Sequence, residues 1–364
     1  MRPAVLPTLG LLLSFAWLGC GESVQSVAVT PIQARIVVTD TVRLAASALG
    51  GNGNVLTDRT VTWESRNAAV ATVDADGLVT GVADGVAEIA ATADGISGTA
   101  SVTVFTPAVL VLSNYRTGNG AILDSFSVRT ANLTYDTLTV SAQTPSVAFL
   151  NQYDVVLLFE DGLFANAINV GDSVGAYVAG GGNVVLGTFY WQERSDNPNF
   201  TEPGWGALEA LDPFTAPYGS EYRADSLDVA SIVAHPMTAG VTALRVHSYH
   251  GGVAAKSGTT VLARWSDACQ TCTGGVNDPL VGYRIGSMGQ RIVGISVAPQ
   301  YPVYGNYSGD FYRLWGNALR WAAAGGSGTT LARSADPMVW PARQATSPAV
   351  PRVGGGSEVR RIDR

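Results

Sequence analysis

Two hydrophobic patterns divide the chain. Between about residues 24 and 105, apolar and polar positions alternate in short runs such as DTVRLAASAL, and turn sequences such as GGNGN and DADG separate them. A period of two, punctuated by Gly, Asn and Asp, predicts short strands with one buried face. We therefore expect residues 24–105 to form a small all-β sandwich.

From residue 108 onward the apolar runs become continuous. AVLVLSNY, YDTLTV, YDVVLLFEDG and NVVLGTF suit strands that are buried on both faces, and later strands are expected at TTVLARW, LVGYRIG and QRIVGISV. NVGDSVGAYVAGGG suits a helix closed by glycines, and GDFYRLWGNALRWAAA suits a second helix. Alternating strands and helices predict an α/β domain over residues 108–324, with an open, mainly parallel sheet covered by helices on both faces.

The two ends of the chain differ from both domains. An apolar run over residues 4–20 follows Arg2, and it is too short and too interrupted by Pro and Gly for a transmembrane helix. Its last residues, WLGC, resemble the lipobox of bacterial lipoproteins, which implies a lipid anchor on Cys20; a plain secretory signal is the alternative. Both interpretations predict an extracytoplasmic protein, anchored to the outer membrane or cell surface, or secreted. Residues 325–364 are rich in Gly, Pro, Ser and Arg and are expected to be flexible.

Composition excludes some partners. The net charge of −7 and the absence of Lys/Arg-rich runs argue against nucleic acid, whose phosphates require a basic face. The single lysine, Lys256, is attributed to genomic composition. Cys269 and Cys272 are predicted to form a disulfide in a loop, with a redox pair or half of a metal site as alternatives. No cofactor or metal is expected, and the sequence does not specify an oligomeric state.

The first domain carries a family resemblance. Trp63, Ser65 and Asn67 form a W-x-S-x-N segment, and VATVDADGLVTGV follows it. These residues resemble the group 2 bacterial immunoglobulin-like (Ig-like) domain. The resemblance implies a rigid, non-catalytic spacer or adhesive module of surface and secreted proteins. Trp63 is expected in its core.

The second domain resembles an enzyme superfamily. YVAGGGNVVLGTF, AHPMTAGV and RIVGISVAPQ are similar to segments of class I glutamine amidotransferase-like proteins, including the ThuA-like branch. The resemblance implies a three-layer, flavodoxin-like α/β fold. It also implies that the catalytic Cys, His and Glu fall on Phe189, Ala298 and Gln300. Phenylalanine cannot attack a carbonyl and alanine cannot accept a proton, so catalysis by this triad is excluded.

The carboxyl ends of the strands hold other candidate residues, because ligands bind there in open α/β sheets. Two carboxylates near a His could support hydrolysis or hold a metal; the alternative is an ordinary turn and a solvated loop. Aromatic residues of the insertion after the fourth strand could contact a saccharide or a peptide, or could fold that insertion onto the sheet. His235 is expected to cap a loop. The candidate ligand-binding residues are Glu160, Asp161, Thr188, Tyr190, Trp191, Glu193, His247 and His250.

These features predict a non-catalytic envelope protein in which an Ig-like spacer presents a degenerate amidotransferase-like domain to a glycan or peptide ligand. A hydrolase or sugar-processing enzyme of the ThuA-like kind, using the carboxylates and His, is the first alternative. A purely structural envelope protein is the second alternative. It predicts that aromatic side chains close the crevice at the edge of the sheet.

Overall fold

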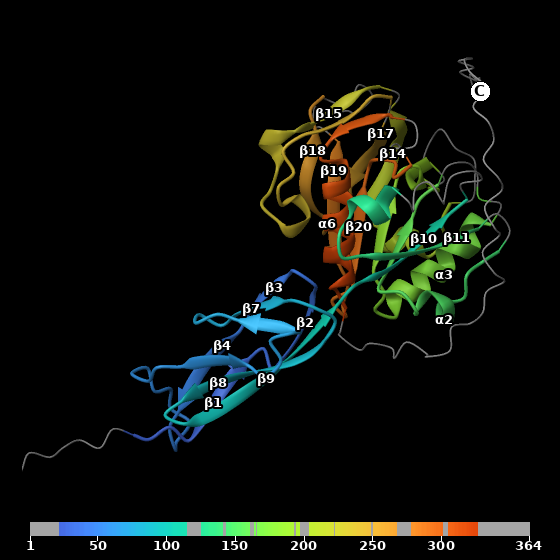
Figure 1. Ribbon diagram of the computed structural model, residues 1–364. Coiled ribbons are helices and arrows are strands. Elements are labelled where there is room, and N and C mark those ends of the chain that lie inside the picture. Colours follow the sequence, from blue (N-terminus) through green and yellow to red (C-terminus); the bar gives the residue numbers. More distant parts are fainter. Residues whose placement is uncertain are drawn as a thin grey trace, which may run out of the picture. The chain divides into compact units, whose positions relative to one another are not determined.

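The computed structural model describes residues 22–114, 125–140, 143–160, 164, 166–192, 194–196, 204–221, 223–248, 250–267, 278–300 and 305–326 (Figure 1). Cys20, Asp161, Glu193, Cys269, Cys272 and the C-terminal tail lie outside the described residues. The predictions made for them therefore stay predictions. Within the described part of the chain, no helix combines the length and the apolar character needed to cross a membrane.

The first domain is an all-β sandwich, as its alternating pattern predicted. Its larger sheet has the order β2-β9-β8-β5, a second sheet has the order β3-β7-β6, and β1 pairs with β4. The strands are β1 (Ser26–Thr30), β2 (Gln33–Val37), β3 (Thr41–Arg43), β4 (Ala45–Leu49), β5 (Thr62–Ser65), β6 (Ala71–Val73), β7 (Leu78–Gly81), β8 (Gly85–Ala93) and β9 (Ile96–Phe105). The inward positions of β8 and β9, such as Ile89 and Val102, are fully buried. Trp63 is partly buried and packs against this core.

The second domain is built on a ten-stranded sheet with the order β11-β10-β12-β13-β20-β19-β18-β15-β16-β21. Its strands are β10 (Ala108–Ser113), β11 (Thr134–Thr139), β12 (Val155–Leu158), β13 (Val184–Gly187), β15 (Asp225–Asp228), β16 (Leu244–Val246), β18 (Thr260–Trp265), β19 (Pro279–Ile285), β20 (Arg291–Ile295) and β21 (Tyr307–Gly309). The strands β14 (Phe214–Glu221) and β17 (His250–Ala255) form a separate two-stranded antiparallel sheet.

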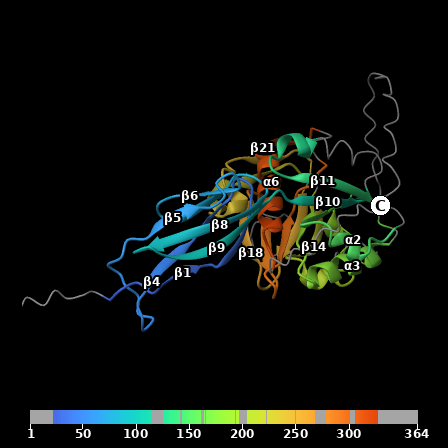
Figure 2. The same cartoon turned by 60° about the horizontal axis from the view of Figure 1, so that its bottom comes forward.

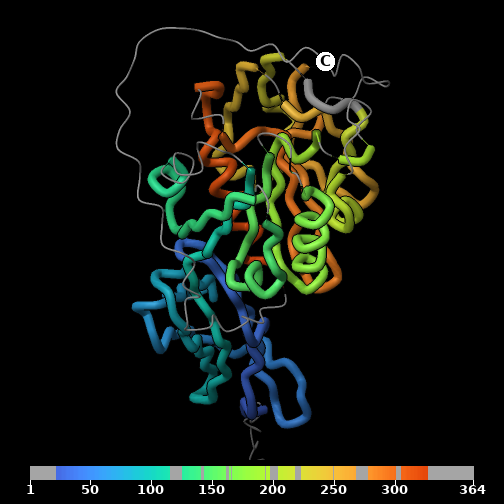
Figure 3. Tube along the Cα trace, turned by 90° about the vertical axis from the view of Figure 1, so that its right-hand side faces the viewer, coloured from blue at the N-terminus to red at the C-terminus, as the bar shows by residue number. Residues whose placement is uncertain are grey.

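The prediction of a mainly parallel sheet is wrong for half of this sheet. The strands β11, β10, β12, β13 and β20 are parallel, whereas every later pairing, from β20 with β19 to β16 with β21, is antiparallel. The turn between β19 and β20 gives the reason: Gly286 and Gln290 pair through their backbones across it, and so tight a turn can join only antiparallel neighbours. Figure 3 shows the orange segment of β20 beside the green strands.

The described helices are few, and the longest two cover opposite faces of the sheet (Figures 1 and 2). One core unites α6 (Phe311–Ala323) with alternate residues of the parallel strands, including Val109, Val185 and Val293. A second core unites α3 (Ala167–Ala179) with the intervening residues, including Leu110 and Leu186. The shorter helices are α2 (Val147–Leu150), α4 (Leu208–Leu211), η1 (Tyr190–Gln192), η2 (Val229–Ser231) and η3 (Pro236–Thr238).

Two local predictions are confirmed. The helix α3 ends at Gly180, the first of the three glycines that follow it. His235 is the N-cap of η3: its Nδ1 accepts a hydrogen bond from the backbone N–H of Met237 at 3.2 Å, and its own N–H donates to the Thr238 hydroxyl.

Candidate functional site

The carboxyl ends of three parallel strands meet through the backbone around Glu160. The carbonyl of Glu160, beyond β12, accepts hydrogen bonds from the N–H of Phe189 (3.1 Å) and from Nε2 of Gln300 (3.4 Å). The N–H of Thr188 donates to the carbonyl of Val297, beyond β20, at 3.0 Å. The fold thus brings together residues that are 140 positions apart in the sequence.

Several polar atoms at this edge are buried and make no hydrogen bond within the described structure. They are Oγ1 of Thr188, Oε1 of Gln300 and Nε1 of Trp315. The indole of Trp315 packs against Gly187, where an added Cβ would lie 2.9 Å from the ring. A buried polar atom without a partner costs about 1–3 kcal/mol, so a group of them indicates a place for ordered water or for a ligand. We call Glu160, Thr188, Gln300 and Trp315 the strand-end site.

The positions that the resemblance assigned to a catalytic triad hold no reactive group. Phe189 is 8% exposed and belongs to the core beneath α6, and Ala298 is fully buried in the same core. Gln300 is also buried, and its amide nitrogen is bonded to Glu160 as described. None of these three side chains can act as a nucleophile or as a proton acceptor.

Tyr190 and Trp191 face the protein interior. Both are fully buried in η1, directly after the tip of β13. The ring of Tyr190 stacks on Trp205 with a centroid distance of 5.0 Å, and Nε1 of Trp205 donates to the Tyr190 carbonyl at 2.8 Å. Trp191 packs against Phe214 at 5.3 Å. These aromatic residues therefore fold the insertion onto the sheet, which was one of the two alternatives left by the sequence.

The two candidate histidines differ in their distance from the strand ends: His247 is remote, whereas a Cβ added at Gly251, next to His250, would lie 3.0 Å from Oγ1 of Thr188. His247 is exposed beside β16, and five strands separate β16 from β12 in the sheet. His250 begins β17 and is fully buried, stacked on Trp265 at 4.4 Å. Its Nε2 lies 3.4 Å from Oδ2 of Asp225, so its nearest carboxylate is one that sequence reasoning did not single out.

Asp225 is held as a carboxylate. Burial raises its pKa, but the close contact with His250 and hydrogen bonds from the backbone N–H of Ser226 and the hydroxyl of Ser266 outweigh burial and lower the pKa below its ordinary value. Among the described residues, no group of three or more His, Cys, Asp or Glu side chains could hold a metal ion.

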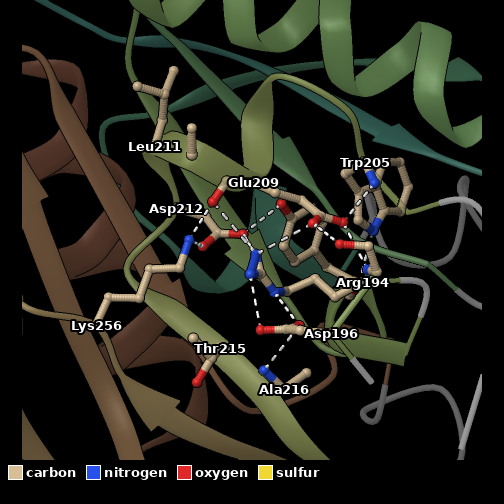
Figure 4. Close-up of polar contacts among 12 residues, drawn as sticks. Arg194, Asp196, Trp205, Glu209, Leu211, Asp212, Thr215, Ala216 and Lys256 are labelled. Atoms are coloured by element: carbon tan, nitrogen blue, oxygen red, sulfur yellow. Dashed lines mark hydrogen bonds and ion pairs between the residues drawn. The ribbon is translucent and has the colours of Figure 1, made fainter. Parts of the chain in front are cut away.

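A second polar group was missed by sequence reasoning. We call it the Asp212 cluster, and Figure 4 shows its charged members. Asp212, directly after α4, is fully buried; its Oδ2 accepts hydrogen bonds from Nη1 of Arg194 (2.7 Å) and from the Tyr190 hydroxyl (2.8 Å). Its Oδ1 lies 2.6 Å from Nζ of Lys256. The members of the cluster are Tyr190, Arg194, Asp196, Glu209, Asp212 and Lys256.

Burial dominates the acid–base properties of this cluster. It raises the pKa of Asp212 to about 6, although Arg194 and Lys256 pull in the opposite direction. The carboxylate of Asp212 in turn raises the pKa of Arg194 despite the burial of the guanidinium. The sequence offered one signal for this cluster, the single lysine in 364 residues. A lysine that occurs only once does little as a solubilising surface charge, so a specific partner was a reasonable expectation.

Comparison with known proteins identifies the first domain. Residues 23–104 match the bacterial Ig-like domain (group 2) family. No curated protein matches the chain.

Solved structures resemble the chain over a limited part of its length. Domains 5–6 of the S-layer protein SbsC are 20% identical, covering 24% of this chain and 46% of that one, with a TM-score of 0.22. The adhesin InvE of Yersinia pseudotuberculosis is 20% identical over 24% of this chain and 30% of its own, with a TM-score of 0.18. An intimin mutant of EHEC O157:H7 is 32% identical over 20% of this chain and 36% of its own, with a TM-score of 0.16. The chain spans less than half of each of these structures.

Proposed function

We propose that this chain is a non-catalytic extracytoplasmic protein of the bacterial cell envelope, in which the Ig-like domain is a spacer for a degenerate, amidotransferase-like binding domain. The single observation that carries the proposal is the composition of the strand ends. Phe189 and Ala298 stand at the positions that the resemblance assigns to nucleophile and base, and both are packed into the core. Substitution at one position alone could leave residual chemistry, but here both reacting groups are replaced.

The topology supports the amidotransferase-like assignment. The parallel half of the sheet, β11-β10-β12-β13-β20, has the strand order 2-1-3-4-5 of flavodoxin-like folds when its strands are numbered along the chain. The antiparallel strands extend this half from β20 outward. The Ig-like domain and the lipobox-like sequence before it support export and an anchor at Cys20, at the outer membrane or cell surface.

The strand-end site supports binding of a glycan or peptide. Thr188, Gln300 and Trp315 are at most 1% exposed, so a ligand reaches their unused hydroxyl, amide oxygen and indole N–H only when the strand ends open. Hydroxyl and amide groups of a ligand both donate and accept hydrogen bonds, so they complement this mixture of donors and acceptors. An anionic ligand fits less well, because the carboxylate of Glu160 stands at the same strand ends while Arg194 and Lys256 are paired with Asp212.

Binding titrations on the full chain test this proposal. Soluble cell-wall muropeptides and oligosaccharides are titrated against the wild type, Thr188→Val and Gln300→Ala. Each substitution removes one hydrogen bond to the ligand, so we expect Kd to rise about 5- to 10-fold. The exposed and remote His247→Ala serves as the control and is expected to bind like the wild type.

Two outcomes contradict the proposal in different ways. Turnover of a fragment that Glu160→Gln abolishes would establish the enzyme alternative. Failure of every fragment to bind would favour the purely structural role, which the burial of Tyr190, Trp191 and Trp205 also supports.

A further inference from the structure

The Asp212 cluster places the only amine side chain of the chain against a buried carboxyl group. Asp212 is fully buried, and the side chain of Lys256 is 16% exposed. The two residues come from different segments: Asp212 follows α4, and Lys256 follows β17. Nζ is also bonded to the backbone carbonyl of Glu209, which fixes its position.

The two oxygens of Asp212 have different environments. Oδ2 accepts two aligned hydrogen bonds, from Arg194 and Tyr190. Oδ1 lies 2.6 Å from Nζ of Lys256, yet this contact is not aligned as a hydrogen bond, and Oδ1 accepts none within the described structure. The amine therefore touches the carboxyl group at ion-pair distance without the alignment of a hydrogen bond.

We propose that Lys256 and Asp212 form an intramolecular isopeptide bond. A proton first passes from the ammonium to the carboxylate, which removes both charges from a buried place. The lone pair of Nζ then attacks Cγ, and the N–C bond forms. The negative charge that develops on Oδ2 is stabilised by Arg194 and Tyr190, which already donate hydrogen bonds to it.

The second half of the reaction releases water. A proton moves from Nζ to the Oδ1 hydroxyl, the Cγ–Oδ1 bond breaks, and the Cγ=Oδ2 double bond forms again. The products are one amide and one water molecule, so the step needs no oxidant, cofactor or second substrate. Two groups that a fold holds in contact react with effective molarities of about 10⁵–10⁸ M. A lysine and an aspartate free in solution lack this advantage of proximity.

The raised pKa of Asp212, about 6, favours the neutral carboxyl group that this reaction consumes. The carboxyl group itself is shielded from water, since Asp212 and its hydrogen-bond partner Tyr190 are fully buried. The bond would join the insertion that contains α4 to the segment after β17, and it would restrain the 43 residues between Asp212 and Lys256.

Mass spectrometry of the purified full chain tests the proposal without any variant. The wild type is expected to be lighter than its sequence by one water molecule, about 18 Da. After denaturation and trypsin digestion, the expected product is a branched peptide that joins Lys256 to Asp212, with no cleavage after Lys256. A mass equal to that of the sequence, with free Lys256 labelled by an amine reagent in the denatured protein, would overturn the proposal.

Variants separate the bond from the ion pair. Asp212→Ala and Lys256→Arg are expected to show no loss of water, whereas His247→Ala, at an exposed residue outside the Asp212 cluster, is expected to show it fully. Tyr190→Phe removes one donor to Oδ2 and is expected to slow bond formation after refolding at least tenfold. Loss of water in Asp212→Ala would place the modification elsewhere and would also overturn the proposal. These mass measurements do not depend on ligand binding, so they succeed or fail independently of the proposed function.

Discussion

Gly77, in the turn before β7, combines a backbone conformation and a close contact that only glycine satisfies. Its φ is +78°, and an added Cβ would lie 2.6 Å from the carbonyl of Leu44 and 2.8 Å from the ring of Trp63. We expect Gly77→Ala to destabilise the Ig-like domain by well over 1 kcal/mol, because backbone strain and steric overlap add. Differential scanning calorimetry measures the loss in the unfolding transition of the Ig-like domain.

Gly53 is the matched control for this substitution. It has the same φ of +78°, but an added Cβ would meet nothing within 4 Å. Gly53→Ala therefore reports backbone strain alone, about 1 kcal/mol. Equal losses in the two variants would show that the contact of Gly77 with Leu44 and Trp63 contributes nothing.

The pair of Asp225 and His250 gives a pH-dependent contribution to stability. The folded protein lowers the pKa of Asp225 below the ordinary value of 3.8. A lowered pKa means that the contribution is fully present above pH 4 and is lost as the pH falls through the folded pKa. We expect Asp225→Asn to cost about 1–3 kcal/mol at pH 7, because the buried partners lose a charged acceptor.

Denaturant unfolding from pH 7 down to pH 3 tests this expectation. The free-energy difference between wild type and Asp225→Asn should shrink below pH 4, where the wild-type carboxyl group also becomes neutral. A difference that is constant over the whole range would mean that the ionised form of Asp225 has no stabilising role.

At the scale of elements, α3 is packed unusually close to the insertion. A Cβ added at Gly171 would lie 1.9 Å from the carbonyl oxygen of Trp205. Alanine is the better helix former by about 1 kcal/mol, so in an open helix this substitution stabilises. Here we expect Gly171→Ala to lower the stability of the second domain, because α3 must move away from Trp205.

The exposed Asn169→Ala, two residues earlier in α3, is the control and should raise stability slightly or leave it unchanged. Thermal unfolding followed by circular dichroism measures both variants. If Gly171→Ala raises the melting temperature as much as the control does, the close approach does not constrain the fold.

Elements with a strong local pattern could be predicted from the sequence. The strands β10, β12, β13 and β20 were visible as apolar runs, and α3 and α6 as helical patterns with a glycine stop or an aromatic stripe. The antiparallel half of the sheet was missed because strand direction depends on the connections, which periodicity does not report.

Prediction of the site was limited in a similar way. Glu160 and Thr188 were candidates because they follow apolar strands, and both lie at joined strand ends; their role in binding stays a prediction. Asp212 and Asp225 were missed because their partners, Lys256 and His250, are distant in sequence and come together only through the fold. A buried charge has no local signature; its surroundings are made by tertiary packing.

At the scale of the whole molecule, the buried cores are separate. One core lies wholly in the Ig-like sandwich and contains Ile89, while Val185 belongs to a core of the second domain. We expect Ile89→Ala to destabilise the first domain by about 2–5 kcal/mol and Val185→Ala to do so only in the second. Calorimetry should then show two transitions, each moved by one variant. A single transition moved by both would show that the domains unfold together.

The position of β20 has a consequence for how the second domain folds. This strand, Arg291–Ile295, lies between β13 (Val184–Gly187) and β19 in the sheet. The parallel and antiparallel halves therefore cannot pair until more than a hundred residues after β13 have been made. Contacts of such long sequence separation make folding slow, because a long loop must close before they form. The Ig-like domain, with its nearby hairpins, can fold while the rest of the chain is still emerging. A nascent chain therefore carries a finished first domain and an unfinished second one until β20, and then α6, have been made.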